Sequence, residues 1–345
     1  CQSYDWLSDA PKIVKFILNR KQRSGKAYAV NSNNTMINNV TSFLKNLSGH
    51  EEIYRKWSKI NIEKAKESQK VIKSNRLSDK QSDNWVDWKE VKEVHQKIDA
   101  SDSNTKIRDH ALLGLYTHLD LGVRRNEPFT QMKVIVSNKF TDATLKSDKK
   151  IPEAWIKSSE LVHEDRGNNY NNYNYLIMRG TNVKMILQRY KTDKHHKEAY
   201  ERNINDTSLK KWLKEYVTKQ KAMKDGDPLF QPERTKKHLS RSTYSGLVTS
   251  AFNKYLGKKI GSQLLRHIYI NEKTDDPNMN VNDREELAES MGHNISTQAV
   301  YRKNLNEPPL SSKQPKKKKN KKRARGGKNK PGPQTRSSGI TYKIN

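Results

Sequence analysis

Residues 173–205 break a pattern that is otherwise helical, and they restrict the fold more than any other part of the chain. Three segments there, NYLIM, KMILQRYKT and EAYERNI, alternate apolar and polar residues in the manner of short strands. The polar stretches RGTN and DKHHK separate them. We therefore predict a small antiparallel β-sheet within a mainly α protein, an α+β fold class.

Apolar residues recur at helical spacing before these strands. The pattern predicts a basic helical module over residues 1–76, in which Asn33 or Asn34 caps the second helix. Further helices are predicted over 85–98 and 106–123.

The helical pattern resumes after the strands. We predict helices over 243–256 and 283–291, the second of which ends at Gly292 in the C′ position. A last helix, capped by Ser296, is predicted to run through Tyr301.

Composition shifts divide the chain into regions. The polar stretch LSDKQSDN, residues 77–84, is rich in turn formers and predicts a linker between the helical module and a second domain over 85–308. Residues 309–345 are basic, of low complexity and interrupted by Pro and Gly, so we predict a disordered tail.

The charge balance indicates a polyanionic partner. The chain has 68 Lys plus Arg against 38 Asp plus Glu, a formal net charge of +30. Residues 309–345 contain 13 of the basic residues and no acidic one, which leaves +17 on residues 1–308. A nucleic acid is the expected partner, because each phosphate neutralised releases counterions. A lysine-rich surface that only aids solubility stays open as the alternative.

Cysteine usage and hydropathy exclude several classes of protein. Cys1 is the single cysteine, so we expect neither an internal disulfide framework nor a cysteine zinc site. No apolar run approaches the roughly 20 residues of a membrane span, and we expect no signal peptide and no membrane partner. Because the chain begins with Cys, we expect a fragment or a trimmed product.

Four short segments carry the chemistry. GVRRNEPF, residues 122–129, places Gly122, Arg124 and Glu127 at spacings of two and three. By itself an Arg with a Glu three residues later is a common helix-surface pair. QRYKT, residues 188–192, follows a predicted strand and contains Lys191, with Lys194 as a nearby competitor.

The other two segments lie in the C-terminal helices. QLLRHIYI contains Arg266 followed by His267, with Gln263 three residues before the arginine. MGHNISTQAVYRK places His293 eight residues before Tyr301. Each of the four segments is weak alone, and their order and placement make the signal.

In that order, the segments resemble the catalytic domain of the tyrosine recombinases, the phage-integrase family, which is related to the type IB topoisomerases. The resemblance covers roughly residues 85–305, and residues 1–76 show a looser one to the family's core-binding module. It implies a DNA-binding module over 1–76 and a catalytic domain over 85–308. The implied activity is site-specific cutting and rejoining of DNA through a 3′-phosphotyrosyl intermediate.

The resemblance also implies a role for each matched residue. Two arginines would clamp the phosphate oxygens, a histidine would donate to them, a lysine would give the leaving oxygen its proton, and a tyrosine would attack phosphorus. These five catalytic residues are Arg124, Arg266, His293, Lys191 and Tyr301. The supporting residues are Glu127, Gln263 and His267. Neither a metal, nor another cofactor, nor ATP is required.

Two departures from the family pattern bear on activity. Gln263 stands where the family has histidine, and glutamine forms hydrogen bonds but does not transfer protons. The spacing from His293 to Tyr301 is eight, where nine is usual. Both favour the alternative of a catalytically inactive DNA-binding relative.

Other readings stay open beside recombination. A type IB topoisomerase uses the same groups to relax DNA as a monomer. A metal-dependent integrase or nuclease would need converging carboxylates, and Asp275 and Asp276 have no third partner in the sequence. His195 and His196 are predicted to be exposed hairpin residues rather than metal ligands.

The resemblance and the tail suggest partners and a location. Recombinases of this family usually assemble as homotetramers on two DNA sites, with a C-terminal segment docked on a neighbour. The basic tail resembles a bipartite nuclear import signal, which predicts a nuclear location in a eukaryotic host or a virus of one. A non-specific DNA tether and a solubility tail are alternatives. The Asn- and Lys-rich composition is typical of an AT-rich genome, such as that of a mobile element or a large DNA virus.

Overall fold

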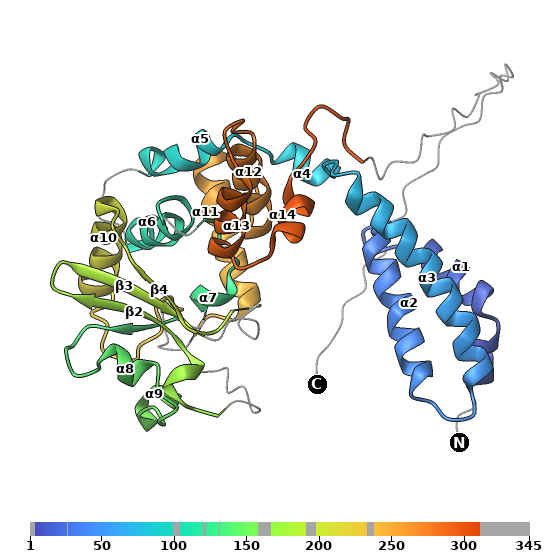
Figure 1. Ribbon diagram of the computed structural model, residues 1–345, viewed down its shortest axis with the longest axis horizontal. Helices are drawn as coiled ribbons and strands as arrows, with labels where there is room; N and C mark the ends of the chain where they lie inside the picture. The colour runs from blue at the N-terminus through green and yellow to red at the C-terminus, as the bar shows by residue number, and fades with distance from the viewer. Residues whose placement is uncertain are drawn as a thin grey trace, which may run out of the picture. The chain divides into compact units, whose positions relative to one another are not determined.

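The structure is a computed structural model that describes residues 4–25, 27–98, 104–119, 122–130, 132–157, 167–190, 198–232 and 238–310. Within these ranges it is mainly helical, with one four-stranded sheet (Figure 1). Residues Cys1–Ser312 form one compact unit, and Lys313–Asn345 lie outside the described residues. The division into 1–76, 77–84 and 85–308 therefore stays a prediction.

The N-terminal helices have a core of their own. They are a 3₁₀ turn (Asp5–Ser8), α1 (Ala10–Asn19), α2 (Val30–Lys45) and α3 (Glu51–Lys73). Trp57 of α3 is fully buried among them, and its indole nitrogen donates to the Leu7 carbonyl at 2.9 Å. This hydrogen bond lets a large polar-edged ring lie in a small apolar core.

The predicted cap of α2 is wrong. The helix begins at Val30 after Ala29, which makes no side-chain cap, and both asparagines lie inside it. Asn34 instead donates to the Lys64 carbonyl of α3 at 3.0 Å, so its amide joins two helices.

The predicted linker contains a short helix, α4 (Asp79–Asp83). Ser78 and Gln81 form a reciprocal capping box at its start, which explains why a polar, turn-rich stretch is helical here. Just before it, the Arg76 guanidinium donates to the Pro308 carbonyl at 2.6 Å. This contact ties the linker to the segment after the last helix.

The second helical set comprises α5 (Trp88–Lys92), a 3₁₀ turn (Glu93–Lys97) and α6 (Asn104–Thr117). Helix α6 ends six residues before the predicted end at 123. Residues 122–126 belong to no helix or strand and precede the short helix α7 (Glu127–Thr130), so the motif around Arg124 lies in a loop.

The sheet has the order β1-β2-β3-β4, with strands β1 (Met132–Ile135), β2 (Asn174–Arg179), β3 (Asn182–Leu187) and β4 (Tyr200–Asn203). The pairs β2–β3 and β3–β4 are antiparallel, as predicted. Strand β1 adds to β2 in parallel, which makes the sheet mixed. Its four residues are all buried and show no alternation, so no strand was predicted there.

Both faces of the sheet are covered, and alternate residues point to different cores. Leu176 and Met178 belong to the main core, where α6 and α10 (Thr207–Lys214) pack. Tyr175 and Ile177 belong to a smaller core on the other face. Helices α8 (Asp142–Leu145) and α9 (Glu153–Lys157) lie on that side (Figure 1).

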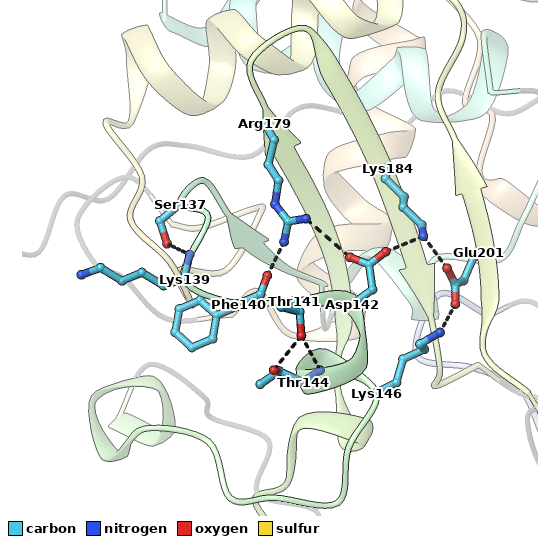
Figure 2. Close-up of polar contacts among 10 residues, drawn as sticks. All are labelled: Ser137, Lys139, Phe140, Thr141, Asp142, Thr144, Lys146, Arg179, Lys184 and Glu201. Atoms are coloured by element: carbon cyan, nitrogen blue, oxygen red, sulfur yellow. Dashed lines mark hydrogen bonds and ion pairs between the residues drawn. The ribbon is translucent and has the colours of Figure 1, made fainter.

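A chain of ion pairs crosses the sheet from β2 to β4 (Figure 2). Lys184 of β3 contacts Asp142 of α8 at 2.6 Å and also pairs with Glu201 of β4. Arg179 reaches Asp142 at 3.7 Å, and Lys146 reaches Glu201. Charges of alternating sign thus hold the edge strand to its neighbour and to α8.

Four more helices follow within the described residues, namely α11 (Arg241–Leu256), α12 (Ser262–Thr274), α13 (Val281–Ser290) and α14 (Ile295–Tyr301). No described helix is both long and apolar enough to span a bilayer. Between α10 and α11 the helix continues as a π-helical turn over Glu215–Gln220.

The turn between α13 and α14 presents the histidine and the tyrosine. Gly292, at φ +70°, donates to the Glu289 carbonyl, and His293 donates to the Ala288 carbonyl. These two bonds form a Schellman motif, so the predicted C′ role of Gly292 is confirmed. The cap of α14 is Asn294, whose side chain accepts from Thr297, and not Ser296.

Candidate functional site

Three segments far apart in the sequence meet around Tyr301. They are the loop before α7, the first turns of α12, and the turn from α13 into α14. Each brings residues from one of the motifs found in the sequence.

Arg266 connects these segments. It is 2% exposed, and one of its terminal nitrogens donates to the carbonyls of Val123 at 2.9 Å and Met291 at 3.1 Å. The other contacts His293 Nδ1 at 2.7 Å. The guanidinium lies 4.7 Å from the centre of the Tyr301 ring. Burial lowers the pKa of Arg266, although nearby Tyr301 opposes the shift.

The contact with Arg266 defines the state of His293. Burial, together with the charge of Arg266, lowers the pKa of His293 to about 4, so the ring is neutral near pH 7. A guanidinium only donates, so Nδ1 must be the acceptor and Nε2 must carry the proton. That Nε2 is buried and has no partner among the described residues. It is a hydrogen-bond donor without an acceptor.

His267 anchors the helix that carries the tyrosine. Its Nδ1 lies 2.6 Å from the backbone oxygen of Tyr301, and burial lowers the pKa of His267 to about 4. Asn271, four residues after His267 on α12, exchanges two hydrogen bonds with the backbone of Lys303, at 2.8 and 2.7 Å. Helix α14 is thereby fixed on α12, in the same chain as the rest of the site.

Arg124 is buried without hydrogen-bond partners. It is 2% exposed, and none of its three guanidinium nitrogens has a partner among the described residues. The guanidinium packs against two aromatic rings, 4.5 Å from the centre of Tyr200 and 5.3 Å from that of Tyr190. Burial lowers the pKa of Arg124. A buried cation without acceptors is costly, so an anionic ligand is the expected partner.

A cleft of about 810 Å³ opens at the Tyr301 hydroxyl. Its lining is mostly basic and hydroxylic, and it includes the first turns of α11 and α12. The lining residues are Arg125, Asn126, Glu127, Arg241, Ser242, Ser245, Ser262, Gln263, Arg266 and Tyr301. Gln263 is exposed in this cleft, and Glu127 pairs with Arg241 across it.

Gly122 allows the loop to approach the turn after α13. Its φ is +63°, and a Cβ there would lie 2.8 Å from Met291 Cγ and 3.1 Å from Ser290 Oγ. Only glycine combines that backbone conformation with that close approach. The glycine of the motif therefore brings Arg124 next to Arg266.

The sequence singled out one arginine of this loop and missed its neighbour. Arg125 is exposed in the cleft, and its terminal nitrogen donates to the Tyr301 hydroxyl at 2.9 Å. The signal was present in the doubled arginine, since of these two neighbours Arg124 is buried and Arg125 is exposed.

The structure thus brings together Arg124, Arg266, His293 and Tyr301, with Glu127, Gln263 and His267 close by. Their catalytic roles stay predictions. Lys191 lies outside the described residues, as do Lys194, His195 and His196.

The described residues contain no cluster of three or more His, Cys, Asp or Glu arranged to hold a metal ion. Asp275, weighed in the sequence as a metal ligand, pairs with Arg302 at 3.1 Å.

Comparison with known proteins finds a likeness to solved structures and none to family models or curated sequences. No family model matches the chain, and neither does any curated protein. A crystal structure of XerA recombinase matches with 15% sequence identity and a TM-score of 0.33, over 86% of this chain and 84% of that one. At that TM-score the likeness does not support a statement about function, which rests on the side chains instead.

Proposed function

We propose that the protein is a DNA strand transferase of the tyrosine-recombinase type, with Tyr301 as its nucleophile. The Tyr301 oxygen bonds to the scissile phosphorus and the bond from phosphorus to the 5′ oxygen breaks. The phenol gives up its proton, and the 5′ oxygen gains one. The 3′-phosphotyrosyl ester conserves the energy of the broken bond, so a 5′ hydroxyl of another strand can reverse the step without ATP.

The other residues stabilise the charge that develops on the phosphate. Arg266 and Arg124 supply guanidinium donors, and His293 supplies its Nε2 proton. Lys191 is proposed from the sequence alone as the proton donor to the leaving oxygen.

One observation carries the proposal. Arg124 and His293, from segments about 170 residues apart in the chain, both keep buried donors that find no acceptor within the described ranges, beside a tyrosine that borders an open basic cleft. A protein satisfies such donors internally unless a ligand takes them. Two buried donors beside a tyrosine hydroxyl that borders the cleft are suited to a phosphodiester.

The test is a covalent adduct on DNA. DNA from the regions flanking the gene would be labelled, nicked near the candidate site to trap the intermediate, and mixed with the full chain. We expect a band on a denaturing gel that protease digestion shortens and that Tyr301→Phe abolishes.

The matched control is Tyr255→Phe, because that tyrosine also has a hydrogen-bonded hydroxyl but contacts Asp109 outside the cleft. The Tyr255→Phe variant should still form the adduct. Adduct formation that survives Tyr301→Phe would overturn the assignment.

The exposed Gln263 favours a second candidate, a DNA-binding relative without activity. DNA binding without an adduct on nicked substrates would support it, and Gln263→His would then be the first change to restore activity. Relaxation of supercoiled DNA without any site requirement would favour the topoisomerase type instead.

Assembly and location follow from the same proposal. We propose a homotetramer on two double-stranded DNA sites, and a nuclear or viral setting that rests on the basic tail. Sedimentation of the protein with and without paired sites would test the first. Expression of a fusion of residues 309–345 to a reporter in eukaryotic cells would test the second.

A further inference from the structure

Two consecutive arginines of one loop make different contacts at the site. Arg124 points into the protein and packs beneath Tyr200, whereas Arg125 is exposed and reaches the Tyr301 hydroxyl. The cleft is lined by Arg125 and not by Arg124. The sequence motif accounts for the first arginine only.

The Tyr301 ring is contacted on its faces, and its oxygen accepts a hydrogen bond from Arg125 at the cleft. Ring centroids of His267 and His293 lie 5.0 and 5.4 Å from that of Tyr301, and the Arg266 guanidinium lies 4.7 Å away. The residue after Tyr301 leaves helical conformation, with ψ 132°. The hydrogen bond from Arg125 therefore fixes where the phenolic oxygen lies along the cleft wall.

The charges around Arg125 give a second reason to expect that it acts together with a bound anion. Its charge contributes to lowering the pKa of both Arg266 and His293, so these groups are close enough to interact. Arg124 acts on the same two groups. Three guanidiniums that repel one another around one tyrosine are stabilised when an anion joins them.

We infer that Arg125 is a positioning residue for the nucleophile. Its planar guanidinium holds the Tyr301 oxygen and, having five donors, can bond a bound phosphate at the same time. It thereby aligns the attacking oxygen with phosphorus and adds a cation beside Gln263. The role in strand transfer rests on the proposed function, whereas the contact itself does not.

The contact can be tested without DNA. 3-Fluorotyrosine would be placed at position 301 of the full chain, and its ¹⁹F resonance would be compared in wild type and Arg125→Gln. Arg302→Gln is the matched control, because Arg302 adjoins Tyr301 in sequence but pairs with Asp275. We expect the resonance to move in the first variant and to stay in the second. An unchanged resonance in Arg125→Gln would overturn the inference.

The positioning role is tested on the nicked DNA. In Arg125→Ala we expect the first-order rate of adduct formation to fall by about 100-fold, as for a misplacement of about 1 Å, while DNA affinity changes by less than about threefold. Added guanidinium ion or Arg125→Lys should recover part of the rate. Equal losses of rate and affinity, or no rescue by either route, would show that Arg125 only binds DNA.

The two failures can be told apart. If wild type forms no adduct, the proposed function fails and the role in catalysis fails with it, while the ¹⁹F shift still reports whether Arg125 holds Tyr301. If wild type forms the adduct and Arg125→Ala does so at the same rate, only the inference about Arg125 fails.

Discussion

Two buried cations in this protein differ in what surrounds them. Lys133, on strand β1, is fully buried, and its Nζ donates to the carbonyls of Gly226 at 3.0 Å and Trp155 at 3.2 Å. It also lies 4.9 Å from the centre of the Tyr173 ring. Arg124 is as deeply buried and packs on aromatic rings too, but no described residue accepts a hydrogen bond from it.

The difference separates a structural group from a group kept for a ligand. The backbone satisfies Lys133, so its burial helps to hold β1 against the segments that carry Trp155 and Gly226. Arg124 costs stability in the free protein and recovers it only when an acceptor arrives. Both cations are deeply buried, so burial does not distinguish them. Arg124 points to the candidate site because its donors lack acceptors among the described residues.

The largest effect is expected from matched substitutions of these two cations. Arg124→Met keeps an apolar stem beneath Tyr200, so we expect unfolding free energy to be unchanged or higher by about 1 kcal/mol. Its rate of adduct formation should fall at least about 1,000-fold, as for loss of a transition-state donor. Lys133→Met should keep that rate and lose about 1–3 kcal/mol of stability, because two carbonyls lose their donor.

Urea unfolding and the nicked-DNA gel measure the two quantities on the same samples. The contrast fails if Lys133→Met, when folded, loses activity to the extent that Arg124→Met does. It also fails if Arg124→Met unfolds as readily as Lys133→Met, since Arg124 would then be a structural group.

Two glycines sharpen the comparison, because each lies beside one of the cations. A Cβ at Gly226, where φ is +86°, would fall 2.2 Å from atoms of the Trp155 indole. At Gly122 the nearest atom is 2.8 Å away, in the flexible Met291 side chain. We expect Gly226→Ala to lose more than about 3 kcal/mol of unfolding free energy and Gly122→Ala about 1–2 kcal/mol.

For the rate of adduct formation the order should be the opposite, with the larger loss in Gly122→Ala. Folded Gly122→Ala should form the adduct more slowly, because the loop that carries Arg124 is displaced from Arg266. Thermal unfolding followed by circular dichroism, with the adduct assay at a temperature where both variants are folded, would check this. A Gly226→Ala variant as stable as wild type would contradict the packing at Trp155.

Much of the fold could be predicted from local patterns. The strands β2, β3 and β4 alternate, and the end of α13 at Gly292 is encoded by one residue type. Strand β1 was missed because its buried position comes from the tertiary fold and its lysine reads as polar. The caps of α2 and α14 were misplaced by a few residues, because several Asn and Ser side chains compete for one position.

The site was predicted as a set of residues, but their contacts could not be. Motif spacing gives Arg266, His293 and Tyr301 as candidates, yet only the fold shows that His293 accepts from Arg266 and that His267 holds the backbone of Tyr301. Arg125 was overlooked because its contact joins residues 176 positions apart. Lys191 stays a prediction from sequence, outside the described residues.

The pH dependence of stability should also separate the two regions. Burial lowers the pKa of Lys133 to about 7 from 10.5, and that of His267 to about 4 from 6.5. In both cases the unfolded chain binds more protons between the two values, so stability rises with pH there. The slope is at most about 1.4 kcal/mol per pH unit for one group. Lys133 in the sheet region therefore makes stability depend on pH above pH 7, and His267 at the candidate site makes it depend on pH below pH 6.5.

Urea unfolding at a series of pH values would compare wild type with one variant for each region. Lys133→Met should reduce the rise in unfolding free energy between pH 7 and 10 and leave the rise between pH 4 and 6.5 unchanged. His267→Gln should do the reverse, while other buried histidines such as His95 and His238, whose pKa values are lowered to about 2 and about 3, keep part of the acid slope in both proteins. A variant that changes both windows equally would mean that the two regions unfold with altered structure, and not that one proton has been removed from each.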